Sequence, residues 1–116
     1  LGALTLDEEL RGWGLAHLPQ LISAVALHPR FAGNAGAVVA AWLDGPREVA
    51  VAAPGLIGLV ARGTAPGMVY AHAAGQPLLQ GREHSDMVFV CQHNVCDAPT
   101  ADPEKVASLV AVQANC

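Results

Sequence analysis

The stretch Val88–Val106, VFVCQHNVCDAPTADPEKV, carries the strongest structural signals in the chain. It begins with an unpunctuated apolar run, which predicts a buried strand over residues 86–92. Asp102, Pro103 and Glu104 then predict a helix start, because Asp caps well, Pro suits the first helical position and Glu is favoured near the positive helix end. The residues of this helix that are predicted to face the sheet are Val106, Leu109, Val110 and Gln113.

Upstream of this strand and helix, the chain changes character near Gly45. Helical patterns precede it, with a capping box of Thr5 and Glu8 and an expected break or restart at Pro19. A second helical piece should stop at His28, before a proline. A third is expected over residues 34–43, capped by Asn34 and ended by Gly45-Pro46. Beyond that point, strands are expected at 47–53 and 67–75, a short helix at 54–63 and a long polar connection at 76–85.

Strands that alternate with helical segments predict an α/β fold. We expect N-terminal helices followed by a small, mostly parallel sheet of about three strands flanked by helices. The chain is interpreted as a single domain, 1–116, with a helical part over 1–45 and an α/β part over 46–116. We expect it to be the C-terminal fragment of a larger protein.

The composition supports that expectation. Hydrophobic residues make up 53% and charged residues 14%, against a usual charged share of about 25%. A fragment whose former interdomain faces are now exposed would explain this shortage of charge. The alternative explanation is a small enzyme with an apolar binding cleft. A net charge of −4 with six scattered basic residues argues against a nucleic-acid partner. The sequence shows neither a membrane-spanning run nor a signal peptide, and three cysteines favour the cytoplasm.

The spacing of Cys91 and Cys96 fits a redox site poorly, because such sites favour C-x-x-C at a helix start. Cys91, Cys96, His93 and His84 could supply four zinc ligands, but there is only one cysteine pair at short spacing. An iron–sulfur cluster normally needs four cysteines. The simplest interpretation is structural: either thiols packed as small apolar groups, or a disulfide that holds the turn between the last strand and the last helix.

The remaining candidates are individually weak. His84, beside Glu83 and Asp86, is the best acid–base cluster, because adjacent carboxylates raise a histidine pKa, although this polar segment should be solvated. His17, His28 and His72 lie in or near helices and strands, and His72 is expected to face inward. Trp13 and Trp42 are interpreted as core residues or interdomain anchors. The chain lacks phosphate-binding loops and nucleophile elbows, so we assign no catalytic, cofactor-binding or metal residue.

The segment PLLQGREHSDMVFVCQHNVCDAPTADPEKVASLV resembles the C-terminal end of the YyaL-type, thioredoxin-domain-containing family. Residues that match the family pattern are Pro77, Leu78, Leu79, Gly81, Arg82, Val90, Cys91, Cys96, Pro99, Asp102 and Leu109. Phe89 stands where the family usually has Tyr. Upstream, HPRFAGNAGAVVAAWLDGPREVAVAAP is similar to the family's helix and following strand, with Ala53-Pro54 in place of a glycine.

Full-length members of that family combine a thioredoxin-like domain with a helical toroid similar to sugar epimerases and glycosidases. The resemblance implies that this chain holds the last toroid helices and a small α/β appendage. We therefore expect a non-catalytic structural or interaction module that packs against the remaining domains of a full-length protein or forms a homo-oligomer. The alternatives are a part of a sugar-handling enzyme active only in the full-length chain, and a small thiol or zinc site at Cys91 and Cys96.

Overall fold

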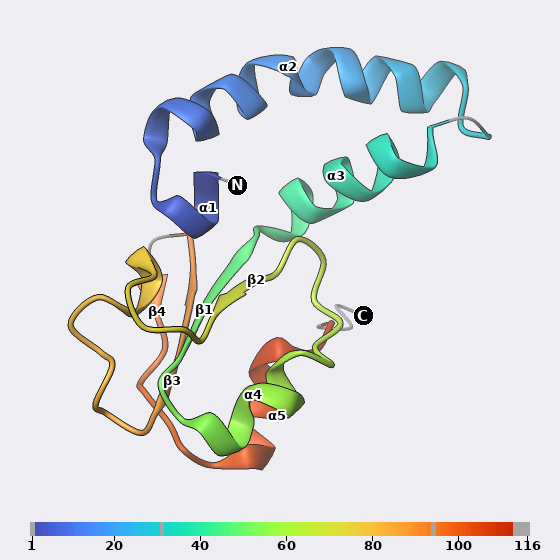
Figure 1. The fold of residues 1–116 in the computed structure, drawn as a ribbon. Helices are drawn as coiled ribbons and strands as arrows, with labels where there is room; N and C mark the ends of the chain where they lie inside the picture. The colour runs from blue at the N-terminus through green and yellow to red at the C-terminus, as the bar shows by residue number, and fades with distance from the viewer. Residues whose placement is uncertain (1, 31, 94, 113–116) are drawn as a thin grey trace.

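A computed structural model describes residues 2–30, 32–93 and 95–112. Figure 1 shows three N-terminal helices followed by a sheet with further helices below it. The N-terminal helices are α1 (Gly2–Thr5), α2 (Glu8–Leu27) and α3 (Gly33–Asp44). The helical part therefore ends beside Gly45, where the sequence pattern changes. Gln113, predicted to lie on the sheet-facing side of the last helix, is outside the described residues.

The sheet confirms the α/β class but is mixed. Its order is β2-β1-β3-β4, formed by β1 (Arg47–Val51), β2 (Val69–Ala71), β3 (Val88–Gln92) and β4 (Val95–Cys96). Only β1 and β2 are parallel, whereas β1 pairs with β3, and β3 with β4, in antiparallel register. The expectation of a mostly parallel sheet of about three strands is therefore wrong in strand direction and one strand short.

The connection from β2 to β3 explains the error. A parallel neighbour requires a crossover that returns the chain to the same end of the sheet, usually through a helix. The segment between these strands holds only the short 3₁₀ helix η2 (Pro77–Leu79) and turns. The chain therefore enters β3 from the opposite end and pairs with β1 in antiparallel register.

The start of α2 differs from the predicted capping box. Thr5 belongs to α1, and Asp7 is the N-cap of α2, where its Oδ1 accepts the backbone N–H groups of Glu9 and Leu10, each at 3.0 Å. Leu6 between the two helices has a φ of 55°. The change of direction at Leu6 separates Thr5 from α2, so Asp7 and not Thr5 caps that helix.

Two further helix predictions change in detail. Pro19 lies inside α2 without breaking it, although an interior proline removes a backbone hydrogen bond and its ring crowds the carbonyl four residues earlier. The predicted stop is confirmed, since the helix ends at Leu27 with His28 as C-cap. Helix α3 begins at Gly33, one residue before the expected cap, so Asn34 lies inside the first turn and Ala32 provides no side-chain cap.

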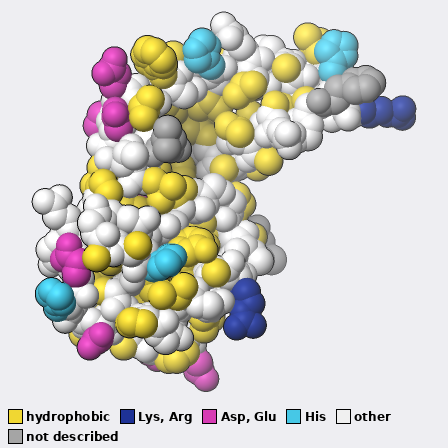
Figure 2. All heavy atoms as spheres, in the orientation of Figure 1, with side chains coloured by type: hydrophobic (Ala, Val, Ile, Leu, Met, Phe, Trp, Pro, Cys, Tyr) yellow, Lys and Arg dark blue, Asp and Glu magenta, His cyan; other side chains and the backbone are white. Residues whose placement is uncertain are grey.

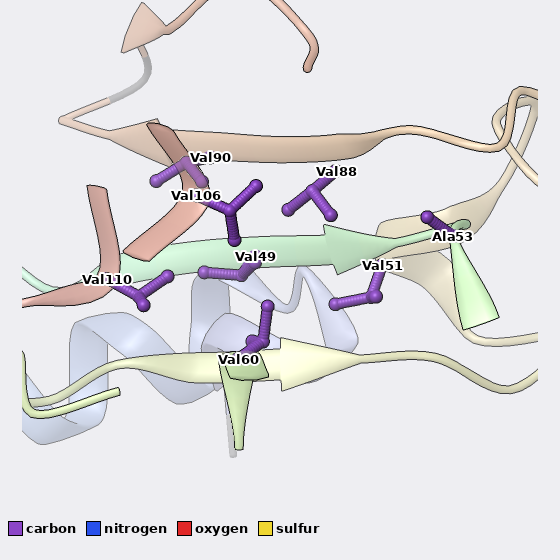
Figure 3. Packing of buried hydrophobic residues seen from close by; sticks show 8 residues of the cluster. All are labelled: Val49, Val51, Ala53, Val60, Val88, Val90, Val106 and Val110. Atoms are coloured by element: carbon purple, nitrogen blue, oxygen red, sulfur yellow. The ribbon is translucent and has the colours of Figure 1, made fainter. Parts of the chain in front are cut away.

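The main core is built from valines on one face of the sheet (Figure 3). Strands β1 and β3 point their alternate side chains toward the short helix α4 (Ile57–Val60), which follows the 3₁₀ turn η1 (Pro54–Leu56), and toward α5 (Pro103–Val110). The buried residues of this cluster are Val49, Val51, Ala53, Val60, Val88, Val90, Val106 and Val110. Helix α5 has the predicted Asp102 cap, whose Oδ1 accepts Glu104 N–H at 2.9 Å.

A second, smaller cluster covers the other face. Ala50, Ala52 and Ala71 of the sheet region pack against Leu78 and Leu79 of η2. Leu4 of α1 and Phe89 of β3 border this cluster. The segment predicted as a long polar connection therefore contributes two buried leucines to the core. We call the part formed by residues 46–112 the sheet body.

Helices α2 and α3 form a hairpin that projects from the sheet body (Figure 1). We call this hairpin the helical arm. The molecule measures 47 × 34 × 21 Å and has a radius of gyration of 15.3 Å, against about 13 Å for a compact domain of this size. Among the described residues, no helix is both long and apolar enough to cross a membrane.

Candidate functional site

The two cysteines of the opening stretch lie directly opposite each other. Cys91 in β3 pairs in register with Cys96 in β4, and a disulfide joins them. The two-residue strand β4 was not expected from the sequence, because it is too short to produce an alternating pattern. Cys91 is buried, whereas Cys96 is exposed to solvent. The disulfide therefore links a core strand to an exposed edge.

The four residues considered for zinc do not form a ligand set. His84 and His93 are both exposed, and both cysteine sulfurs are bonded to each other. Across the described residues, no group of three or more His, Cys, Asp or Glu side chains could hold a metal ion. His84 lies in the turn before β3, away from the β3–β4 hairpin that carries the two cysteines, and sequence spacing alone does not show this.

The hairpin of β3 and β4 reaches the joint between the helical arm and the sheet body. Gln92 Nε2 donates to the backbone carbonyls of Asp44 and Gly45, at 2.7 Å each. The His93 ring lies against Gly45, so close that a Cβ there would collide with it. Gly45 itself has a φ of 87° and ends α3. These side chains clamp the joint.

Other contacts hold the same joint. The buried Arg47 side chain lies 3.9 Å from the Asp44 carboxylate and donates from Nη1 to the carbonyl of Ala111 at 2.6 Å. Farther along β1, Glu48 forms an ion pair with Arg11 of α2. The base of the helical arm is thus tied to the sheet body by polar contacts to consecutive residues of β1.

The other histidines, His17, His28 and His72, lie at the surface. His17 is exposed on α2, with Nδ1 3.4 Å from Gln20 Oε1, and His28 is exposed at the helix end. The expectation that His72 faces inward is wrong, because β2 ends at Ala71 and His72 begins a turn. Its ring stacks on Tyr70 with centroids 6.1 Å apart. None of these positions supports acid–base chemistry.

A cavity of about 510 Å³ opens between the helical arm and the sheet body, and Figure 2 shows the hollow with hydrophobic side chains along it. The Arg11–Glu48 ion pair lies in its wall, and Arg11 Nε is buried without a hydrogen bond in the described structure. The lining residues most relevant to binding are Leu10, Leu15, Leu18, Val38, Trp42 and His93. A mostly apolar hollow of this size falls in the range of ligand sites.

The helical arm exposes most of its large apolar side chains. Leu18 is the only buried residue of α2, and α3 has none. The exposed set comprises Leu10, Trp13, Leu15, Ile22, Leu27, Val38, Trp42 and Leu43. Both tryptophans, interpreted as core residues or interdomain anchors, are thus open to solvent, at 68% for Trp13 and 45% for Trp42.

No family model matches the chain, and comparison with the curated proteins and with the solved structures finds no match. The resemblance carried by the two-cysteine tail therefore stays a prediction.

Proposed function

We propose that this chain is a non-catalytic structural and interaction module, the C-terminal part of a larger protein, in which the helical arm packs against further helices. The observation that carries the proposal is the apolar surface of α2 and α3. Surface helices of globular proteins present one apolar stripe, whereas a helix that is apolar all round is normally buried. Trp13 and Leu27 of α2 are among the exposed residues, at 68% and 73%.

The charge distribution supports an apolar partner. On α3, Asp44 is the only ionisable side chain, and it sits at the end next to the sheet body. Helix α2 carries its charges only in the first turns, as Glu8, Glu9 and Arg11. Along α2 and α3 between these ends, His17 is the one titratable side chain, and the turn that joins the helices carries His28 and Arg30. Most of the length of the helical arm therefore offers apolar contact, as a helix inside a larger helical assembly does.

The resemblance to the thioredoxin-domain-containing family names the partner: the remaining helical domains of a full-length protein. In the isolated chain, a second copy would cover the same surface. The proposal assigns neither nucleic acid nor a membrane as partner. It keeps the cytoplasmic location expected from the sequence, and this makes the disulfide notable, because cytoplasmic disulfides in mesophiles are usually transient or redox-active.

Two matched substitutions test the proposal. Leu43 on α3 and Val95 on β4 are equally exposed, at 71% and 72%. We expect the isolated chain to self-associate with increasing concentration. Leu43→Lys should weaken this association about tenfold or more, because the contact would bury a charge. Val95→Lys should leave the association unchanged. Sedimentation velocity over a concentration series measures all three. A strict monomer that binds no hydrophobic dye, in all three proteins, would contradict the proposal.

The alternative of a sugar-handling enzyme, active only in the full-length chain, is favoured by one observation. The cavity at the base of the helical arm combines an indole with a carboxylate, those of Trp42 and Glu48. Glycosidases generally use a pair of carboxylates. Glu48 is the one carboxylate in the lining of this cavity as described, so the second would have to come from the rest of the full-length chain. Loss of activity in a full-length protein that carries Trp42→Ala, with an intact sheet body, would favour this alternative.

A further inference from the structure

We propose that the Cys91–Cys96 disulfide is a thiol-exchange modification site, which a dithiol opens by attack on Cys96, and that its opening loosens the joint between the helical arm and the sheet body. This inference goes beyond packing, because it assigns a chemical change to the hairpin that holds the joint. It rests on the difference in exposure between Cys91 and Cys96, on a cavity that both cysteines line and on the contacts from Gln92 and His93 to Gly45.

The two cysteines differ in accessibility. Cys91 is 9% exposed, within β3 next to the buried Val90, whereas Cys96 is exposed on the edge strand β4. Thiol–disulfide exchange needs access of the incoming thiolate to the attacked sulfur. The exposed residue is therefore the electrophile, and the buried Cys91 is the leaving group.

A cavity of about 410 Å³ lies beside the disulfide and is lined by both cysteines. Arg82 and Glu48 also border it, and the Arg82 guanidinium lies 4.9 Å from the centroid of the Phe89 ring. A cation near a sulfur favours its thiolate form. Arg82 is the cation among the side chains that line this cavity with the two cysteines, and the carboxylate of Glu48 in the same lining is paired with Arg11.

The exchange balances as a two-electron transfer. The first thiolate of the dithiol attacks Cys96 Sγ, a mixed disulfide forms, and the Cys91–Cys96 bond breaks to leave a Cys91 thiolate. The second thiol of the reagent then attacks, as its thiolate, the reagent sulfur that is bonded to Cys96. This step closes a disulfide within the reagent and releases the Cys96 thiolate. The reagent becomes a disulfide, and the protein gains two electrons and two protons as two thiols.

The structure also limits what opening releases. Beyond Cys96, Asp97 N–H donates to the Val90 carbonyl at 2.9 Å, and Val88 and Thr100 exchange two backbone hydrogen bonds. These bonds keep the following segment on the sheet. The released part is therefore β4 together with His93, whose ring lies against Gly45. Gln92, at the end of β3, stays paired with Arg47 of β1 and loses only its β4 neighbour, which loosens its contacts with Asp44 and Gly45.

The first arm of the test identifies the attacked sulfur. The whole chain in a Cys116→Ser background is incubated natively with reduced glutathione, quenched in acid and mapped by mass spectrometry. We expect the glutathione adduct on Cys96 and a free thiol at Cys91. An adduct on Cys91, or a disulfide that opens only when the core amide of Val106 also exchanges, would overturn the proposal.

The second arm tests coupling to the joint by hydrogen exchange in oxidised protein and in protein reduced with dithiothreitol. Gly45 N–H donates to the Ala41 carbonyl at 3.1 Å. We expect its exchange to accelerate about tenfold on reduction, with Val106 unchanged, because local opening leaves the core intact. Cys91→Ala/Cys96→Ala should reproduce the reduced state.

Gln92→Ala in the oxidised protein is the matched control, because it removes the two hydrogen bonds and keeps the disulfide. It should raise Gly45 exchange to the level of the reduced protein, and reduction should then add little. Equal Gly45 exchange in oxidised and reduced protein, with the disulfide shown to be open, would overturn the coupling to the joint.

Discussion

The sheet body and the helical arm use apolar residues in opposite ways. In α5 of the sheet body, Val106 and Val110 are at most 2% exposed, and the charged Glu104 and Lys105 face outward. In the helical arm, apolar residues occur around α2 and α3, and Leu18 alone is buried. The same residue types form a core in one region and a bare surface in the other.

The difference teaches that apolar content does not locate a core. A core requires an apolar stripe with a partner that covers it. Helix α5 has such a stripe and rests on β1 and β3. Among the described residues, the helical arm packs only within its own hairpin and, at its base, against α1 and the sheet body. Its stability within this chain should therefore depend little on side-chain packing.

The largest expected difference in the free energy of unfolding is between substitutions of two leucines, one in each region. Leu79 is 2% exposed in the sheet body and Leu43 is 71% exposed on the helical arm. We expect Leu79→Ala to lower the free energy of unfolding by about 2–5 kcal/mol, because it leaves a cavity, and Leu43→Ala to change it by less than about 0.5 kcal/mol. Urea unfolding of both variants measures this. Equal losses would mean that the helical arm is covered in solution.

The next effect concerns the joint between the regions. Gly45 and Gly75 both have positive φ, at 87° and 84°, but a Cβ at Gly45 would collide with the His93 ring, whereas Gly75 has open space. We expect Gly75→Ala to cost about 1–2 kcal/mol from the left-handed backbone alone. Gly45→Ala should cost measurably more. The same loss in thermal unfolding of both variants would show that His93 does not clamp the joint.

The sequence predicted local features in both regions, but not how the strands pair. The β3 run, the Asp102-Pro103-Glu104 start of α5 and the end of α2 at His28 are local signals, and the structure has all three. Strand direction was missed because it depends on the β2–β3 connection. Local residue preferences in that connection do not show at which end of the sheet the chain re-enters.

The candidate site was predictable only in part. The cysteine spacing indicated a structural link, but β4 and the register that places Cys91 opposite Cys96 follow from tertiary pairing. The contact of Gln92 with Asp44 and Gly45 joins residues nearly fifty positions apart. No sequence pattern identifies the carbonyl that a glutamine will contact, because its amide can donate to any carbonyl within reach.

The smallest expected change in stability comes from removing a helix N-cap, and each region has one aspartate cap. Asp102 accepts Glu104 N–H at 2.9 Å at the start of α5, and Asp7 accepts two N–H groups at 3.0 Å at the start of α2. Loss of an aspartate cap generally costs about 0.5–2 kcal/mol. Asp102→Ala should lower the unfolding free energy of the whole sheet body by about 1 kcal/mol, because α5 covers the valine core.

Asp7→Ala should instead act locally, because the helical arm is weakly coupled to the core. Both tryptophans lie in the helical arm and the one tyrosine, Tyr70, lies in β2, so the two fluorophores report on different regions. We expect Asp7→Ala to move the tryptophan-detected transition to lower urea and to leave amide protection at Val106 unchanged, since regions of low stability open separately from the core. If tryptophan fluorescence and core amides shift together in this variant, the helical arm and the sheet body unfold as one cooperative unit, and the contrast between them holds for packing but not for stability.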